Sequence, residues 1–361
     1  MKELKSFVKK LLYDNYPIGN ILSVDYIKQG DTNNSFFAVS EDKEGNLTKW
    51  YVRQYNLAEE ERDIIYEHAF EKYFKDRVAG EIQTMLPLET GSGKTWVEGE
   101  YDGENHLYAV FNTMEGLEPY SWEYNNMTQN ALNSCADITA KFHAWSYGFE
   151  PPAGIDRREP PLEELFEIWK KDLPAYLEEK KKDRNYQRFT EYFEKEVPFL
   201  LDTIDFCAAE LKKYKKDLKY CINHKDLNPG NVMFDNDDNI IAVFDMDWVN
   251  TDYRLYDIAW MGYQAIASWD VNSWGAVPVE QLDNFMERYN RIMIDRESPL
   301  GPLNESETAF LPTMMIIGAI KVVVDFSCYE DHYDEVHRMF CNTWRFVNSI
   351  HELRTYVENN K

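Results

Sequence analysis

Near residue 112 the chain changes from short alternating runs to long helical patterns. Before this point, the runs Ile21–Ile27, Ser35–Val39 and Lys49–Tyr55 alternate in the way that half-buried strands do. A helix is expected over residues 1–20 and another over 58–75, with further strand-like runs at 82–88, 95–99 and 107–111. The pattern predicts an α+β fold with two lobes, a small antiparallel-sheet lobe over 1–112 and a large, mostly helical lobe over 113–361.

Long helical patterns dominate the second lobe. They cover residues 127–146, 163–181, 185–214, 255–267, 279–296 and 305–359, the last with breaks. Short strands are expected at 220–222 and around 232–245, and the Asp- and Asn-rich segment Asp235–Asn239 predicts a turn within the latter.

The chain is strongly acidic, with 64 Asp and Glu against 39 Lys and Arg and a formal net charge of −25. Residues 1–112 hold 20 acidic and 13 basic residues, so the larger lobe carries −18 of the total. The acidity argues against nucleic acid or an anionic membrane as a partner, because both need basic patches. It suits a cationic or neutral small substrate, and it equally suits solubility alone.

Several sequence features point to the cytoplasm. No run approaches the roughly 18 apolar residues of a membrane span, and the N-terminus lacks the apolar core of a signal peptide. The five cysteines are widely spaced and contain no C-x-x-C pair, so neither a disulfide framework nor a zinc site is indicated. The sequence leaves the oligomeric state open.

The segment around His224 carries the chemistry. It has the form H-x-D-x-x-x-x-N, with Asp226 and Asn231, and an apolar strand that ends at Asp245 follows it. Phosphoryl transfer needs a carboxylate to orient the attacking hydroxyl and accept its proton, and it needs hard oxygen ligands for Mg²⁺. Asp226 is therefore the candidate base, and Asn231 and Asp245 are the candidate metal ligands. A hairpin across the Asp235–Asn239 turn would bring these two ligands to neighbouring places.

These motifs resemble those of the protein-kinase-like small-molecule kinases, which include aminoglycoside phosphotransferases, choline kinases, homoserine kinase type II and N-acetylhexosamine 1-kinases. The family's H-G-D-x-x-x-x-N loop is matched from His224 to Asn231, and its I-D-x-D motif by residues 244–247. Residues 254–259, Arg-Leu-Tyr-Asp-Ile-Ala, resemble its L-Y-D-L-A segment. The resemblance implies a bilobal protein-kinase-like fold, with ATP as co-substrate and Mg²⁺ as cofactor between the lobes.

The resemblance also implies residues for nucleotide binding. Residues 30–39 resemble the family's nucleotide loop, Arg53 stands where a phosphate-gripping cation is expected, and residues 110–116 match the connection between lobes that faces the adenine. The positions carried over for nucleotide binding are Gly30, Asn34, Arg53, Glu67, Asn112 and Met114. Glu67 would be the acidic partner of Arg53, although Glu71 lies one helical turn away and competes for this assignment.

Other positions are assigned to the substrate side or to support of the loop. His224 and Asp257 are expected to brace the catalytic loop, and His143 is expected to be a core histidine. Asp247 contacts metal or substrate, or anchors the structure, and Trp248 forms a wall of the acceptor pocket or packs in a core.

Two features depart from related patterns. Lys225 replaces the usual glycine of H-G-D, where it could meet phosphate, substrate or water. About ten residues separate Asp245 from Leu255, too few for an activation loop, which disfavours a protein substrate. Residues 91–95, Gly-Ser-Gly-Lys-Thr, resemble the end of a P-loop, but its first glycine would fall at Leu88, so a turn is expected instead.

The sequence thus predicts an ATP- and Mg²⁺-dependent kinase of a small-molecule hydroxyl, with a sugar, amino alcohol or amino-acid-like metabolite as acceptor. An aminoglycoside phosphotransferase is the alternative that the acidic second lobe would suit. A catalytically idle, kinase-like protein that binds nucleotide is an alternative of another class.

Overall fold

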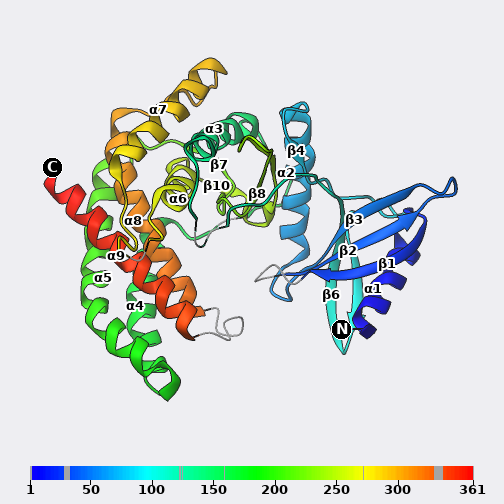
Figure 1. The fold of residues 1–361 in the computed structure, drawn as a ribbon, viewed down its shortest axis with the longest axis horizontal. Helices are drawn as coiled ribbons and strands as arrows, with labels where there is room; N and C mark the ends of the chain where they lie inside the picture. The colour runs from blue at the N-terminus through cyan, green and yellow to red at the C-terminus, as the bar shows by residue number, and fades with distance from the viewer. Residues whose placement is uncertain are drawn as a thin grey trace. The chain divides into compact units, whose positions relative to one another are not determined.

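The computed structural model describes residues 2–27, 33–121, 123, 125–157, 159–270, 272–328 and 336–360. The chain forms two compact units (Figure 1). The first comprises residues 1–117, 148–157 and 241–248, and the second comprises 118–147, 158–240 and 249–361.

A five-stranded antiparallel sheet forms the first unit. Its strands are β1 (Asn20–Ile27), β2 (Asn34–Glu41), β3 (Leu47–Gln54), β5 (Val97–Tyr101) and β6 (Glu104–Asn112), in the order β1-β2-β3-β6-β5. The register places Arg53 of β3 opposite Ser35 of β2 and Ala109 of β6. Arg53 therefore sits in a central strand, where the backbone on both sides is fixed by ladder hydrogen bonds.

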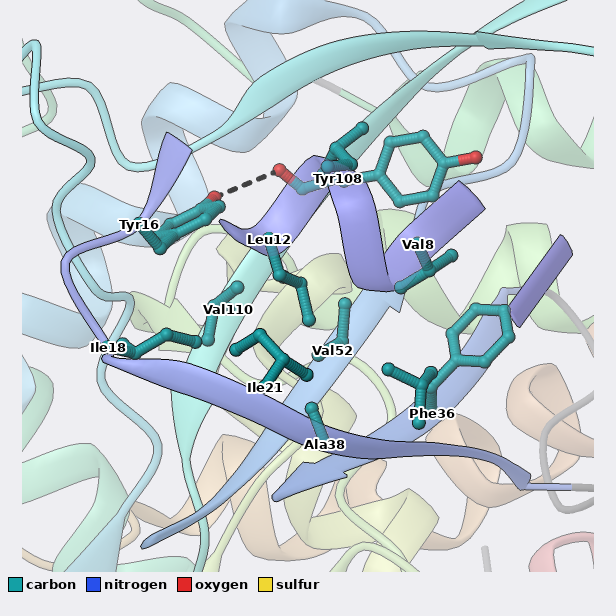
Figure 2. Packing of buried hydrophobic residues seen from close by; sticks show 12 residues of the cluster. Val8, Leu12, Tyr16, Ile18, Ile21, Phe36, Ala38, Val52, Tyr108 and Val110 are labelled. Atoms are coloured by element: carbon teal, nitrogen blue, oxygen red, sulfur yellow. Dashed lines mark hydrogen bonds between the residues drawn. The ribbon is translucent and has the colours of Figure 1, made fainter. Parts of the chain in front are cut away.

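Helix α1 (Lys2–Asn15) covers one face of this sheet. Figure 2 shows Val8 and Leu12 of α1 above Phe36, Val52 and other apolar side chains of the strands. The spacing of Val8 and Leu12 by one helical turn puts both on the sheet-facing side. Burial of each such side chain contributes roughly 1.5–3 kcal/mol. The Tyr16 hydroxyl closes this core by donating to the Tyr108 carbonyl over 3.3 Å.

Helix α2 (Glu61–Val78) completes the first unit, together with the short strand β4 (Gln83–Thr84) and the carboxyl end of β9 (Ile240–Val243). Of the strand expected over 82–88, only Gln83 and Thr84 form a strand, in parallel with Ala242 and Val243, and Pro87 forms an isolated antiparallel bridge with Phe111. A turn follows at Thr90, whose N–H donates to the Lys94 carbonyl over 2.7 Å. It leads into strand β5, so no P-loop helix begins there.

The second unit is mostly helical, as the sequence predicts. Its long helices are α3 (Gln129–Ser146), α4 (Leu162–Lys180), α5 (Gln187–Tyr214), α6 (Leu255–Ile266), α7 (Val279–Asp295), α8 (Glu305–Cys328) and α9 (Val336–Asn359). Two short strands, β7 (Tyr220–Asn223) and β10 (Asn250–Tyr253), pair antiparallel. Strand β8 (Val232–Phe234) leads into a turn that the Asp235 N–H closes by donating to the Asn239 carbonyl over 2.9 Å.

The mixed α+β architecture is confirmed. One helix, α8, is more apolar than expected from sequence. Residues Glu305–Asp325 of α8 are long and apolar enough to cross a membrane by length and composition. In the structure 72% of that apolar window is buried inside the protein. This burial is what a core helix of the second unit requires.

Candidate functional site

Arg53 is the centre of a charged cluster in the first unit. Its side chain is 2% exposed, and its guanidinium donates to Glu67 over 2.8 Å and to Asp245 over 2.7 Å. A third carboxylate oxygen, on Asp247, lies 3.9 Å away. Burial alone would lower the pKa of Arg53, but Glu67 first and then the other acids outweigh it and hold the pKa well above its usual value. The guanidinium is therefore permanently charged.

The structure decides between Glu67 and Glu71 as the partner of Arg53. Glu67 accepts from Arg53 and also from the Tyr55 hydroxyl over 3.0 Å. Glu71 is 2% exposed, and neither of its oxygens has a hydrogen-bond partner among the described residues. Burial, and then the charge of Glu67, raises the pKa of Glu71 well above its usual value. Both effects favour the protonated, neutral form of the Glu71 carboxyl.

Asp245 and Asp247 follow β9. Asp245 directly precedes the short helix η2 (Met246–Trp248), and Asp247 lies within it. Asp245 adopts a φ of 66°, a left-handed conformation that costs a residue with a side chain about 1–3 kcal/mol. Its side chain is 37% exposed, whereas that of Asp247 is 7% exposed. Burial, and then Asp245, raises the pKa of Asp247 well above its usual value. Trp248 is 37% exposed, so it is not a core residue.

A buried chain of hydrogen-bonded polar groups, which no sequence pattern indicates, lies next to Glu67. The Tyr55 hydroxyl, which donates to Glu67, lies 3.1 Å from Nε2 of His68, and Nδ1 of His68 lies 2.7 Å from the Thr95 hydroxyl. Burial, and then Arg53, lowers the pKa of His68 to about 3, so this imidazole is neutral. The chain fixes Glu67 and therefore the direction of Arg53.

The remaining nucleotide residues are placed as follows. Gly30 lies outside the described residues. The Asn34 side chain accepts from Tyr26 and donates to Gln54, both over 3.1 Å, within the sheet. Its neighbour Asn33 instead donates to Asp247 over 3.2 Å. The sequence offered two adjacent asparagines and no signal to choose between them.

The segment after β6 is held from both sides. The Asn112 amide oxygen accepts from the Leu86 N–H over 2.6 Å, and its amide nitrogen donates to the Thr84 carbonyl over 3.1 Å. The Asn112 side chain is thus a structural tie. Met114 and Phe244 are partly buried against an apolar cluster that contains Phe111.

Asp226 lies in the second unit, in the loop after β7. Its Oδ1 accepts from the Asn228 amide over 3.0 Å and from the indole N–H of Trp260 over 3.2 Å. Its Oδ2 accepts from the Asn231 amide over 2.8 Å. Three N–H donors from the loop and from α6 therefore fix the direction of a half-buried carboxylate.

Asp257 of α6 anchors this loop through hydrogen bonds to its backbone. Its carboxylate accepts from the backbone N–H of His224 over 2.6 Å and of Lys225 over 2.9 Å. Nε2 of His143 lies 3.3 Å from the same carboxylate, and Nδ1 of His143 lies 2.9 Å from the Tyr289 hydroxyl. His143 and Asp257 are both fully buried, so they brace the loop from within the core.

The backbone conformation at Lys225 explains why glycine is common at this place in the motif. Its φ is 72°, in the left-handed region that glycine adopts freely. Its ammonium nitrogen lies 2.6 Å from Asp252 and 2.8 Å from Glu159, and it stands 3.7 Å from the centre of the Tyr256 ring. Burial would lower the pKa of Lys225, but Tyr256, Asp252 and Glu159 together raise it.

The donor set fits Mg²⁺ only together with phosphate oxygens. Among the described residues, no three His, Cys, Asp or Glu side chains are arranged to hold a metal ion. Mg²⁺ needs fewer protein ligands than that, because it commonly takes one or two carboxylates and completes its shell with water and substrate phosphates. Asp245 offers a carboxylate oxygen and Asn231 an amide oxygen, and each is of the hard type that Mg²⁺ prefers.

Comparison with known proteins now identifies the family. The model of the phosphotransferase enzyme family matches residues 27–299, most of the chain, and the chain belongs to that family. The prediction of a phosphotransferase is thereby confirmed. No curated protein matches the chain closely enough to count as a relative.

Solved structures share the fold at low sequence identity. A microcompartment-associated aminopropanol kinase is 15% identical, with a TM-score of 0.67 over 97% of this chain and 98% of that chain. A spectinomycin phosphotransferase in complex with ADP and spectinomycin is also 15% identical, with a TM-score of 0.66 over 97% and 98%. The choline kinase of Cryptosporidium parvum is 15% identical, with a TM-score of 0.62 over 98% and 97%.

Proposed function

We propose that this phosphotransferase uses Mg²⁺ and ATP to phosphorylate a hydroxyl group of a small molecule. The observation that carries the proposal is the Asp226 carboxylate, which three N–H donors fix in direction while it remains half-buried. A carboxylate held in this way can orient an acceptor hydroxyl and take its proton. The acceptor oxygen then bonds to the terminal phosphorus of ATP as the bond to ADP breaks.

On the donor side, each residue has a separate task. Arg53 binds phosphate oxygens, and Glu67 holds its guanidinium in place. Asn231 donates to Asp226 through its amide nitrogen, which leaves its amide oxygen available as a metal ligand, and Asp245 would supply a carboxylate oxygen. When bound, Mg²⁺ neutralises charge on the phosphates. Met114 and Phe244 contact the adenine ring.

For the acceptor, we propose a sugar, an amino alcohol or an amino-acid-like metabolite. The related folds belong to proteins described as aminopropanol, choline and spectinomycin kinases or phosphotransferases, all of which act on hydroxyl-bearing compounds. An aminoglycoside is the alternative that the net charge of −18 in residues 113–361 favours. Small metabolites of these classes favour action in the cytoplasm.

The test is acceptor-dependent release of ADP from Mg-ATP. The panel contains hexosamines, neutral sugars, homoserine, choline, ethanolamine and several aminoglycosides, and GTP replaces ATP in a parallel series. Asp226→Asn should abolish turnover while nucleotide still binds. Asp237→Asn, which removes the same charge from an exposed turn, should retain full activity. Equal activity of Asp226→Asn and the wild type would refute the proposal.

A catalytically idle protein would behave differently in the same assay. It would bind Mg-ATP but release no ADP with any acceptor in the panel or in a metabolite extract. The presence of Asp226, Asn231 and Asp245 together favours the active enzyme, because loss of any one of them would suffice to disable it.

A further inference from the structure

The side chain of Lys225 ends in a site built for an ammonium ion. Two carboxylates, on Asp252 of β10 and on Glu159 before α4, contact its nitrogen at 2.6 and 2.8 Å. The face of the Tyr256 ring lies 3.7 Å from the nitrogen on α6. Two carboxylates and an aromatic face are the groups with which proteins recognise alkylammonium ligands. Here the ligand is a side chain of the protein itself.

This cation site adjoins the candidate base. Tyr256 and Trp260 lie one turn apart on the same face of α6. Tyr256 faces the ammonium group of Lys225, and Trp260 donates its indole N–H to the carboxylate of Asp226. Consecutive residues of the loop are therefore anchored on consecutive turns of one helix.

The position of Lys225 in the backbone adds a second argument. A φ of 72° favours glycine, yet the residue at this position is a lysine with a long, flexible side chain. A loop that needed only this conformation would be served better by glycine. The lysine side chain is 3% exposed, so contact with bulk water does not explain its presence.

We propose that Lys225 is a specificity-determining residue whose ammonium group fills a cation site beside Asp226 and keeps an ammonium group of the acceptor out of it. The native acceptor is then a compound that presents neutral groups at this place, such as a neutral sugar. This statement about the acceptor rests on the proposed function. The existence of a filled cation site does not.

The first experiment tests the site without turnover. Lys225→Gly removes four carbons and the ammonium group, which n-butylammonium replaces. Glu159 and Asp252 are 27% and 20% exposed, so a solute can reach their carboxylates. We expect n-butylammonium chloride to bind Lys225→Gly saturably and raise its melting temperature, with an affinity roughly tenfold above that of n-butanol.

Matched proteins define the controls at equal ionic strength. The wild type should show no saturable response, because its own ammonium fills the site. Lys225→Met keeps most of the stem and should also show none. Lys216→Gly removes an exposed lysine from the same unit and should behave as the wild type. Equal responses to n-butylammonium in Lys225→Gly and in these three proteins would overturn the proposal.

A folding defect would not leave the proposal undecided. If Lys225→Gly is unfolded alone, refolding it in n-butylammonium should recover native protein, and n-butanol should not. Failure of n-butylammonium to recover it would overturn the filled site.

The second experiment tests specificity. Lys225→Gly should shift the ratio of kcat/KM for ethanolamine or choline over that for a neutral sugar at least tenfold toward the cation. A wild-type enzyme whose best acceptor is ethanolamine or choline would refute the specificity claim. Absence of turnover in every protein would refute the proposed function instead, while binding of n-butylammonium would still decide the cation site.

Discussion

Asp257→Asn should loosen the loop that carries Asp226. The carboxylate of Asp257 is fully buried and accepts from two backbone N–H groups, those of His224 and Lys225, and asparagine offers only one oxygen. One charge-assisted hydrogen bond, which contributes about 1.5–3 kcal/mol, is lost. A buried N–H then faces an NH₂ group and loses its acceptor at a further cost of about 1–3 kcal/mol. The free energy of unfolding should therefore fall by about 3 kcal/mol or more.

Urea unfolding measures this loss. With a slope of about 3 kcal/mol per molar urea, the midpoint should fall by about 1 M. Asp237→Asn, a surface change of the same charge, should stay within about 0.5 kcal/mol of the wild type. Turnover of Asp257→Asn should fall as well, since the loop orients the base. An Asp257→Asn protein as stable as the Asp237→Asn control would show that this bracing is not what holds the loop.

Three further predictions concern buried ionisable side chains. Arg254 forms a fully buried ion pair with Glu307 of α8, whose carboxylate also accepts from the backbone N–H groups of Lys219 and Asn304. Arg254→Met leaves this buried carboxylate without its cation, so urea unfolding should show a loss of about 3–5 kcal/mol. The pKa of Glu71 is raised in the fold, so the wild type loses stability as pH rises above the unfolded pKa of about 4.3. Above that pH, Glu71→Gln should become more stable relative to the wild type by up to about 1.4 kcal/mol per pH unit, until the pKa of Glu71 in the folded protein is reached. Urea unfolding at a series of pH values measures this difference, and a difference that does not change with pH would contradict the prediction. Arg53→Lys cannot span both of its carboxylate partners at 2.7–2.8 Å, so calorimetry should show weaker Mg-ATP binding.

The strands of the antiparallel sheet were predictable from sequence, whereas strand β10 was not. The antiparallel run of β1, β2 and β3 alternates visibly and is joined by short turns. The strand at Asn250–Tyr253 was missed, because its sequence Asn-Thr-Asp-Tyr has no apolar alternation and its partner Tyr220–Asn223 lies far back in the chain. Its existence depends on a pairing that no local pattern records.

The contacts of the candidate site were also only partly predictable from sequence. The sequence motif around Asp226 identified this loop as a candidate site. The contacts of Asp226 with Asn228 and Asn231 follow from the closeness of these residues in sequence. The sequence could not show that Glu67, and not Glu71, contacts Arg53, because both glutamates are buried on one face of α2. That choice depends on Tyr55 and Arg53, which reach α2 from another element.

The division of the chain has a consequence for protein engineering. Residues 148–157 and 241–248 belong to the first unit although they follow parts of the second. A fragment that ends at Leu117 would expose the apolar cluster where Phe244 packs and would leave Arg53 without Asp245. The two units are thus interleaved along the gene, so a chimera that exchanges one unit must exchange three separate segments at once.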